Sequence, residues 1–197
     1  GKKRIGVVRG GRSLNDQLKA KIEKLAEESG AELRYIAQIR NEPYIEDIFR
    51  CMDEVREFEP DMILAIGGGS VLDTAKAIHL FYENPEMSFE EATIPYALPA
   101  LGKKAVHVAV PTTSGTGSET TSCAVFIDPE TKTKKLLLDN TIIPHYAILD
   151  ADMTDSLPTS ITVATGLDAL THSIEASTAM NASAMTRAIA MEAAVDI

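Results

Sequence analysis

The feature that most constrains the fold of this chain is an apolar run that three glycines follow at once. Residues 62–66 read MILAI and contain no polar side chain, which is typical of a strand buried on both faces of a parallel sheet. The next residues are Gly67, Gly68, Gly69 and Ser70, and residues 71–82 then show helical spacing. Glycines between a buried strand and a helix let the backbone approach a phosphate closely, and the N–H groups at the helix start favour the same anion. This segment therefore predicts a turn that binds the pyrophosphate of a dinucleotide.

A simpler interpretation is open for the polar residues of the same turn. Ser70 and Asp73 have the spacing of a capping pair, so both could serve only to start the helix. The pattern is also not GxGxxG, and three glycines alone are weak evidence. A second loop adds weight, because residues 111–119 (PTTSGTGSE) follow another apolar run and offer hydroxyl groups and amides to a ribose, a phosphate or a carboxamide. In isolation that loop could equally be a flexible hairpin.

The rest of the first 150 residues or so alternates between strand and helix patterns. Apolar runs at residues 5–8 and 105–110 predict further strands, residues 31–38 also read as a strand, and residues 45–55 carry one helical stripe. Such alternation predicts an α/β fold with an open, mostly parallel dinucleotide-binding sheet and helices on both faces. Ligands of such sheets bind beyond the carboxyl ends of the strands.

Strand patterns stop at Pro158, and residues 160–197 carry only helical spacing. We therefore expect two domains: a dinucleotide-binding α/β domain over residues 1–157, and the start of an all-helical domain over residues 158–197. Because the chain opens on Gly1 and stops at Ile197 inside a helical pattern, we expect it to be a portion of something longer.

Charge and cysteine content exclude several classes of partner. The formal net charge of −10 at pH 7 would repel the phosphate backbone of a nucleic acid. The 2 cysteines make no disulfide framework in a chain of 197 residues, so a reducing, cytoplasmic setting fits best. No stretch of about 18 uninterrupted apolar residues occurs, so we expect no membrane partner. The sequence is compatible with a homodimer.

One pair of side chains has the spacing of metal ligands. Asp168 and His172 are four residues apart, so on a helix both lie on one face and can reach a single divalent ion. The alternative is an ordinary Asp–His pair that hydrogen-bonds along the helix. The other histidines, His79, His107 and His145, fall in unrelated contexts, and we expect each to be structural or exposed.

Three segments in order now identify a family. GGGSVLDTAK at residues 67–76, PTTSGTGSE at 111–119 and GLDALTHSIEA at 166–176 together resemble the iron-containing, or group III, alcohol dehydrogenases. LLLDNTIIPHYAILDADMTDSLP at 136–158 is similar to the lactaldehyde and propanediol reductase branch. The resemblance implies a metal-dependent alcohol dehydrogenase or aldehyde reductase, with NADP or NAD, Fe²⁺ or Zn²⁺, and a small alcohol or aldehyde as substrate. Family members are longer, which implies that a leading strand region and most of the helical, metal-binding domain lie outside this chain.

The resemblance also implies roles for particular residues. It assigns nucleotide binding to the pyrophosphate turn Gly67, Gly68, Gly69 and Ser70, to Asp73 near the nicotinamide, to Thr112, Thr113 and Thr116 along the nucleotide, and to Lys134 reaching the cofactor. Asn41 falls near a nucleotide contact, although Glu42 and Pro43 depart from the usual Asn, Pro, Thr order. Asp168 and His172 match the first two metal ligands, and the other two in the family are histidines further along the chain.

A departure from the family pattern bears on the choice of cofactor. Many members place an Asp after the first strand to bind the adenosine ribose, whereas this chain reads Val8, Arg9, Gly10, Gly11, Arg12 there. An arginine such as Arg9 can grip a 2′-phosphate that an acidic residue would repel, so the sequence favours NADP over NAD. An arginine can also simply point to solvent.

Two other functions stay open at this stage. A lyase of the dehydroquinate synthase type shares a related two-domain plan, but its loop would not be expected to read TSGTGSE as residues 113–119 do here. Alternatively, these 197 residues bind nucleotide without turnover, because they lack part of the expected metal site.

Overall fold

A computed structural model describes residues 1–11, 14–39 and 43–197. Contacts between Cα atoms divide the chain into two compact units. The first unit comprises Gly1–Pro111 and Ser118–Asp150, and the second comprises Thr112–Gly117 and Ala151–Ile197. The domain boundary that the sequence predicts between residues 157 and 158 stays a prediction.

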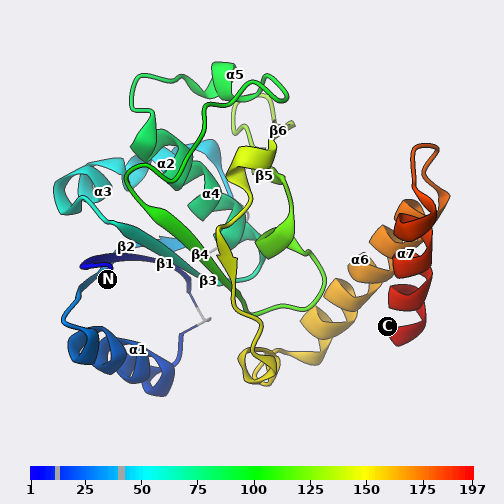
Figure 1. Cartoon of the computed structure of the whole chain (residues 1–197), viewed down its shortest axis with the longest axis horizontal. Helices are drawn as coiled ribbons and strands as arrows, with labels where there is room; N and C mark the ends of the chain where they lie inside the picture. The colour runs from blue at the N-terminus through cyan, green and yellow to red at the C-terminus, as the bar shows by residue number, and fades with distance from the viewer. Residues whose placement is uncertain (12–13, 40–42) are drawn as a thin grey trace. The chain divides into compact units, whose positions relative to one another are not determined.

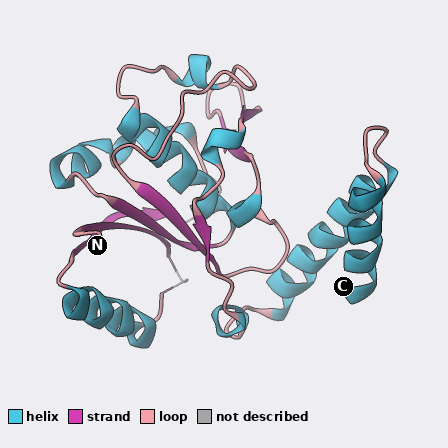
Figure 2. Cartoon of the chain, viewed as in Figure 1, coloured by secondary structure: helices cyan, strands magenta, loops and turns pink. Residues whose placement is uncertain are grey.

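The first unit is built on a parallel sheet of five strands in the order β2-β1-β3-β4-β7 (Figure 2). The strands are β1 (Arg4–Gly10), β2 (Glu32–Ile39), β3 (Met62–Gly67), β4 (Val106–Pro111) and β7 (Tyr146–Ala147). An open parallel sheet with helices was the fold class predicted from the alternating pattern, and it is confirmed. Strands at the centre are buried on both faces because helices cover each side, which is why β3 and β4 read as continuous apolar runs.

Helices lie on both faces of this sheet. They are α1 (Asp16–Ser29), α2 (Ile45–Arg50), α3 (Met52–Phe58), α4 (Gly69–Glu83) and α5 (Phe89–Ala92). Figure 1 shows α1 on one face and α2, α3 and α4 on the other. Helix α1 starts at its N-cap Asn15, whose side chain accepts from Leu18 N at 2.8 Å, and ends at Gly30 with a left-handed φ of 66°.

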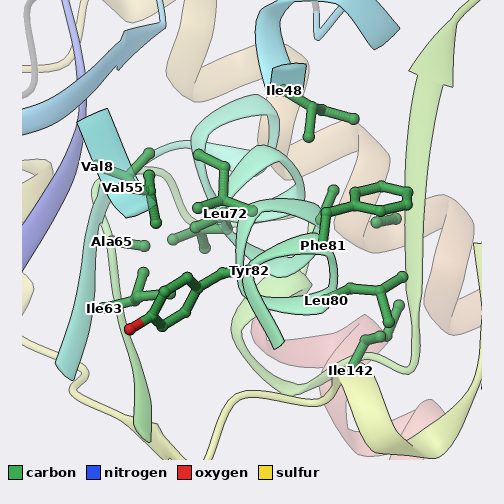
Figure 3. Packing of buried hydrophobic residues seen from close by; sticks show 14 of the residues in the cluster. Val8, Ile48, Val55, Ile63, Ala65, Leu72, Leu80, Phe81, Tyr82 and Ile142 are labelled. Carbon is green, nitrogen blue, oxygen red and sulfur yellow. The ribbon is translucent and has the colours of Figure 1, made fainter. Parts of the chain in front are cut away.

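Helix α4 forms the centre of the hydrophobic core (Figure 3). Leu72 and Phe81 on this helix pack with Val8 and Ile63 of the sheet and with Ile48 of α2, and all five are at most 2% exposed. Full burial of such side chains contributes roughly 1.5–3 kcal/mol each. The helix that follows the glycine turn is therefore held rigidly, and so is the turn itself.

The predicted helix over residues 45–55 is in fact two helices, and on this point the prediction is wrong. Cys51 ends α2 and precedes α3, with φ −96° and ψ −3°, and its thiol donates to Ile48 O at 3.1 Å. Met52 and Val55 remain buried on the far side of the break. The apolar stripe therefore survives although the helix is interrupted.

A separate two-stranded antiparallel sheet completes the first unit. It pairs β5 (Cys123–Ile127) with β6 (Lys134–Leu138). Short 3-10 turns at Ser118–Thr120 and Asn140–Ile142 flank the pair.

The second unit contains a helical hairpin. Helices α6 (Thr159–Thr178) and α7 (Ala184–Asp196) lie side by side (Figure 1), preceded by a 3-10 turn at Ala151–Thr154. This agrees with the helical spacing seen after Pro158. Within residues 1–11, 14–39 and 43–197, no helix is both long enough and apolar enough to cross a membrane.

Candidate functional site

The glycine turn and the threonine-rich loop leave neighbouring strands at the same edge of the sheet. Gly67 at the end of β3 is in register with Pro111 at the end of β4, and the two strands are parallel. A Cβ on Gly67 would lie 2.5 Å from Val71 Cγ2, so only glycine allows helix α4 to begin this soon after the strand. The glycine turn and the threonine-rich loop therefore start from adjacent points on the carboxyl edge of the sheet, where ligands of parallel sheets bind.

Gly68, and not Ser70, is the N-cap of helix α4. Its φ of −76° and ψ of −177° are extended, and its carbonyl accepts from Val71 N at 2.9 Å and from Leu72 N at 3.2 Å. The N-cap makes no side-chain cap hydrogen bond. Interpretation of Ser70 and Asp73 as a capping pair is therefore wrong, because Ser70 already lies inside the first helical turn. A helix start that no side chain caps suits an anion such as a pyrophosphate.

Asp73 has both carboxylate oxygens bound within the protein. Its Oδ1 accepts from Ser118 Oγ at 2.6 Å and its Oδ2 accepts from Val125 N at 2.9 Å. Burial raises the pKa of Asp73, although these hydrogen bonds and the charge of Lys76 act in the opposite direction. Asp73 therefore joins the helix after the glycine turn to the segment that follows the threonine-rich loop.

Lys76 is a residue of this region that the sequence interpretation missed. Its side chain is 0% exposed, and its Nζ donates to Thr121 O, Thr121 Oγ1 and Cys123 O at 3.0, 3.1 and 2.7 Å. Burial lowers the pKa of Lys76 in spite of Asp73, whose Oδ1 lies 3.8 Å away. The available signal was a lysine flanked by Ala75, Ala77 and Ile78, because a lysine between buried apolar residues needs a buried partner.

The threonine-rich loop contains an unsatisfied hydroxyl. Thr113 Oγ1 is buried and has no hydrogen-bond partner in the described part of the chain, and Thr112 is 7% exposed. Gly115 cannot carry a Cβ, because that atom would run into the backbone oxygen of Thr165. A buried hydroxyl without a protein partner fits a polar ligand at this loop.

Arg9 lies at the carboxyl end of β1, on the same edge as the glycine turn. Its Nη2 donates to Gln38 Oε1 at 2.8 Å, and its guanidinium carbon lies 5.6 Å from the centre of the Tyr35 ring. These contacts from β2 orient the guanidinium. Asn41 lies outside the described residues.

Lys134 begins β6 and pairs with Ile127, at the turn end of the two-stranded sheet. Ile127 N donates to Pro43 O at 2.9 Å, so this end lies beside Pro43. Lys134 is exposed there.

Asp168 and His172 lie on one face of α6, as their spacing predicts. His172 Nε2 is 3.7 Å from Asp168 Oδ1, and the side chains are 53% and 43% exposed. Among the residues that the structure describes, no group of three or more His, Cys, Asp or Glu could hold a metal ion. The pair fits a divalent ion as two ligands of an incomplete set.

The other three histidines cluster, so the expectation that they fall in unrelated contexts is wrong. The His79 ring centre lies 5.8 Å from that of His107 and 5.6 Å from that of His145. His79 Nε2 lies 3.0 Å from Ala105 O and 3.2 Å from Glu83 Oε1, and His145 Nδ1 accepts from His107 N at 3.2 Å. Both ring nitrogens of His107 are buried without a partner in the described ranges. The cluster lies at the amino end of β4, away from the glycine turn.

Comparison with known proteins agrees with this arrangement. A family model described as iron-containing alcohol dehydrogenase matches residues 1–151. An NADPH-dependent butanol dehydrogenase from Clostridium saccharobutylicum is 39% identical over 193 residues, which is 98% of this chain and 50% of that protein. A probable alcohol dehydrogenase, EutG, from Salmonella typhimurium is 43% identical over 156 residues, 77% of this chain and 38% of that protein.

Solved structures show the same likeness. The iron-containing alcohol dehydrogenase from Thermococcus thioreducens superposes with a TM-score of 0.88 and 34% identity, covering 98% of this chain and 52% of that one. A 1,3-propanediol oxidoreductase gives a TM-score of 0.84 and 30% identity, covering 98% and 50%. This chain thus spans about half the length of the relatives it matches. It belongs to the iron-containing alcohol dehydrogenase family.

Proposed function

We propose that this chain is the nucleotide-binding portion of a metal-dependent alcohol dehydrogenase or aldehyde reductase. The proposed reaction transfers hydride between NADP or NAD and a small alcohol or aldehyde. The observation that carries the proposal is the register of Gly67 with Pro111, which places the uncapped helix start and the residue from which the threonine-rich loop departs at one sheet edge. Family membership supports the reaction class.

In this proposal each segment has a share in holding the nucleotide. The backbone N–H groups at Gly69 and Ser70 bind the pyrophosphate, because helix geometry leaves them without an acceptor in their own helix. Thr112, Thr113 and Thr116 offer hydroxyl groups to the sugars or the carboxamide. The remaining assigned contact is that of Lys134. Asp73, which the resemblance assigns to the region near the nicotinamide, has both carboxylate oxygens bound by Ser118 and Val125.

NADP is the proposed preference because of Arg9. Gln38 engages one of its guanidinium nitrogens, and a guanidinium carries five N–H donors in all, so donors remain for a phosphate. The similarity to an NADPH-dependent butanol dehydrogenase is in line with this choice.

The proposed metal is Fe²⁺ or Zn²⁺, held in part by Asp168 and His172. When bound, such an ion polarises the substrate carbonyl as a Lewis acid. His172 must be neutral to act as a ligand, and its position one helical turn after Asp168 aims both donors to the same side. The family resemblance assigns the other two ligands to histidines further along, so we propose that these 197 residues do not turn over alone.

The proposed place of this chain in its family is the lactaldehyde and propanediol reductase branch. Support comes from the segment at residues 136–158 and from the structural likeness to a 1,3-propanediol oxidoreductase. A lyase of the dehydroquinate synthase type is disfavoured by the family match over residues 1–151.

Fluorescence titration of the chain with NADPH and NADH tests the proposal. We expect binding in the micromolar range or weaker, tighter for NADPH, and no reduction of propanal or lactaldehyde with Fe²⁺ or Zn²⁺ added. A folded chain that binds neither nucleotide would overturn the assignment. Efficient aldehyde reduction by the chain alone would contradict the proposed incompleteness of its metal site.

A further inference from the structure

Lys76 is buried more completely than a lysine normally is, and it is fully hydrogen-bonded. Its three N–H donors match three acceptors, namely Thr121 O, Thr121 Oγ1 and Cys123 O. These acceptors lie in the stretch that connects the threonine-rich loop to β5. The lysine therefore ties the central helix α4 to a segment about 45 residues further along the chain.

Asp73 reinforces the same connection one helical turn earlier. Its two oxygens hold Ser118 Oγ and Val125 N, on either side of the residues that Lys76 binds. The Asp73–Lys76 clamp, as we call this pair with its partners, thus holds residues 118–125 at both ends and in the middle. Four of its hydrogen bonds are 3.0 Å or shorter, as in well-formed charge-assisted contacts.

The residues of the clamp lie next to both segments that are proposed to bind the nucleotide. Ser118 follows directly on the threonine-rich loop of residues 112–117, and Asp73 lies in the first turns of the helix that the glycine turn starts. At the other end of the loop, Pro111 is paired in register with Gly67. Both ends of the loop are therefore fixed to the same strand–turn–helix segment.

We propose that Lys76 and Asp73 are positioning residues for nucleotide binding: they hold residues 118–125, and with them the exit of the threonine-rich loop, against the helix that the glycine turn starts. The inference rests on the proposed function. Lys76 then acts on nucleotide binding through residues 118–125 and makes no direct contact with the nucleotide. The Asp73 carboxylate has the same role.

Hydrogen–deuterium exchange of the full chain tests the clamp without any ligand. Lys76→Met keeps a long, unbranched side chain but removes the charge and all three donors. We expect amides in residues 112–125 to exchange about tenfold faster, with β1–β3 unchanged. Ser118→Ala, which leaves Lys76 and its acceptors in place, provides a milder variant in case Lys76→Met does not fold. Ile78→Val, a core truncation two residues away on the same helix, controls for general destabilisation. Unchanged exchange in residues 112–125 of both Lys76→Met and Ser118→Ala would overturn the clamp.

NADPH titration of the same variants tests positioning. We expect Lys76→Met to weaken binding about tenfold and Ile78→Val to leave it within about twofold. If the clamp acts through the loop, the loss must shrink to less than about threefold when Thr113→Val has already removed a loop hydroxyl. An equal loss in both backgrounds, or no loss, would overturn the positioning role. Absence of binding by the unsubstituted chain would overturn the proposed function and this role with it, and that failure is visible before any variant is made.

Discussion

Gly67 and Pro111 face each other in register at the ends of the parallel strands β3 and β4. Each residue begins a segment that the family resemblance assigns to the nucleotide. Because a parallel register aligns the carboxyl ends of neighbouring strands, two segments more than 40 residues apart in the chain start from adjacent points. Because of this register, the starting points of both segments lie on one edge of the sheet, which is the candidate binding edge.

Gly67→Ala is expected to destabilise the protein and to abolish nucleotide binding. The new Cβ would meet Val71 Cγ2 at 2.5 Å, and the helix start would have to shift to relieve the contact. Overpacking of this kind costs about 1–3 kcal/mol, measured as the free energy of unfolding in urea. Gly166→Ala is the matched control, since nothing lies within 4 Å of its Cβ and alanine favours a helix interior. Equal effects of the two substitutions would contradict the steric explanation.

Arg9→Ala is expected to weaken binding of NADPH by about tenfold to a hundredfold and to change binding of NADH little. Removing a charge-assisted contact to a 2′-phosphate costs about 1.5–3 kcal/mol, and NADH has no such phosphate. Fluorescence titration with both nucleotides measures the ratio. Arg56→Ala, which removes an exposed arginine of α3, controls for net charge. A parallel loss for both nucleotides would remove Arg9 from the 2′-phosphate site.

His172→Ala is expected to lower the affinity of the chain for Zn²⁺ or Co²⁺ at least about tenfold. The imidazole and Asp168 are the two paired donors on α6, so the loss of one leaves a single carboxylate. Calorimetric titration measures the affinity, and His145→Gln, outside the pair, should leave it unchanged.

Glu83→Gln is expected to reduce the free energy of unfolding by about 2–4 kcal/mol. The side chain is 3% exposed, and its carboxylate accepts from the backbone N–H groups of Gly102, Lys103, Lys104 and Ala105 at 2.9–3.2 Å. An amide has one acceptor oxygen and an NH₂ group that would face these donors. Glu86→Gln, on the exposed surface nearby, should change the free energy by less than about 0.5 kcal/mol in the same urea titration.

The histidine cluster is expected to make the protein less stable in mild acid. Burial lowers the pKa of His79 and, more strongly, of His107 below 6.5, the ordinary value that the unfolded chain retains. The stabilisation is therefore fully present above about pH 6.5 and declines as the pH falls through the folded pKa, because the unfolded state binds more protons. Urea unfolding between about pH 5 and 7.5 measures the slope.

His107→Leu tests which residue carries that slope. Neither ring nitrogen of His107 has a hydrogen-bond partner in the described ranges, so an apolar side chain loses no hydrogen bond of the ring. We expect the variant to unfold at similar or higher urea concentration at neutral pH and to show a shallower loss toward pH 5. An unchanged slope would assign the acid sensitivity to other groups.

Local pattern alone was sufficient for the parallel sheet, the glycine turn and the Asp168–His172 face. Their signals are short-range: an apolar run, three consecutive glycines, and two donors one helical turn apart. The break at Cys51 was not visible in the same way, because Ile48, Met52 and Val55 keep their spacing on both sides of it.

Only the tertiary structure decided what the buried polar residues do. The sequence determines that Lys76 lies in a helix between apolar residues, but its acceptors come from residues 121 and 123, and the two histidines around His79 come from β4 and from the residue before β7. A buried charge or imidazole depends on groups within a few ångströms in space, which chain folding brings from distant positions. Periodicity is a property of neighbouring residues, and for that reason it determines elements and turns but not these partnerships.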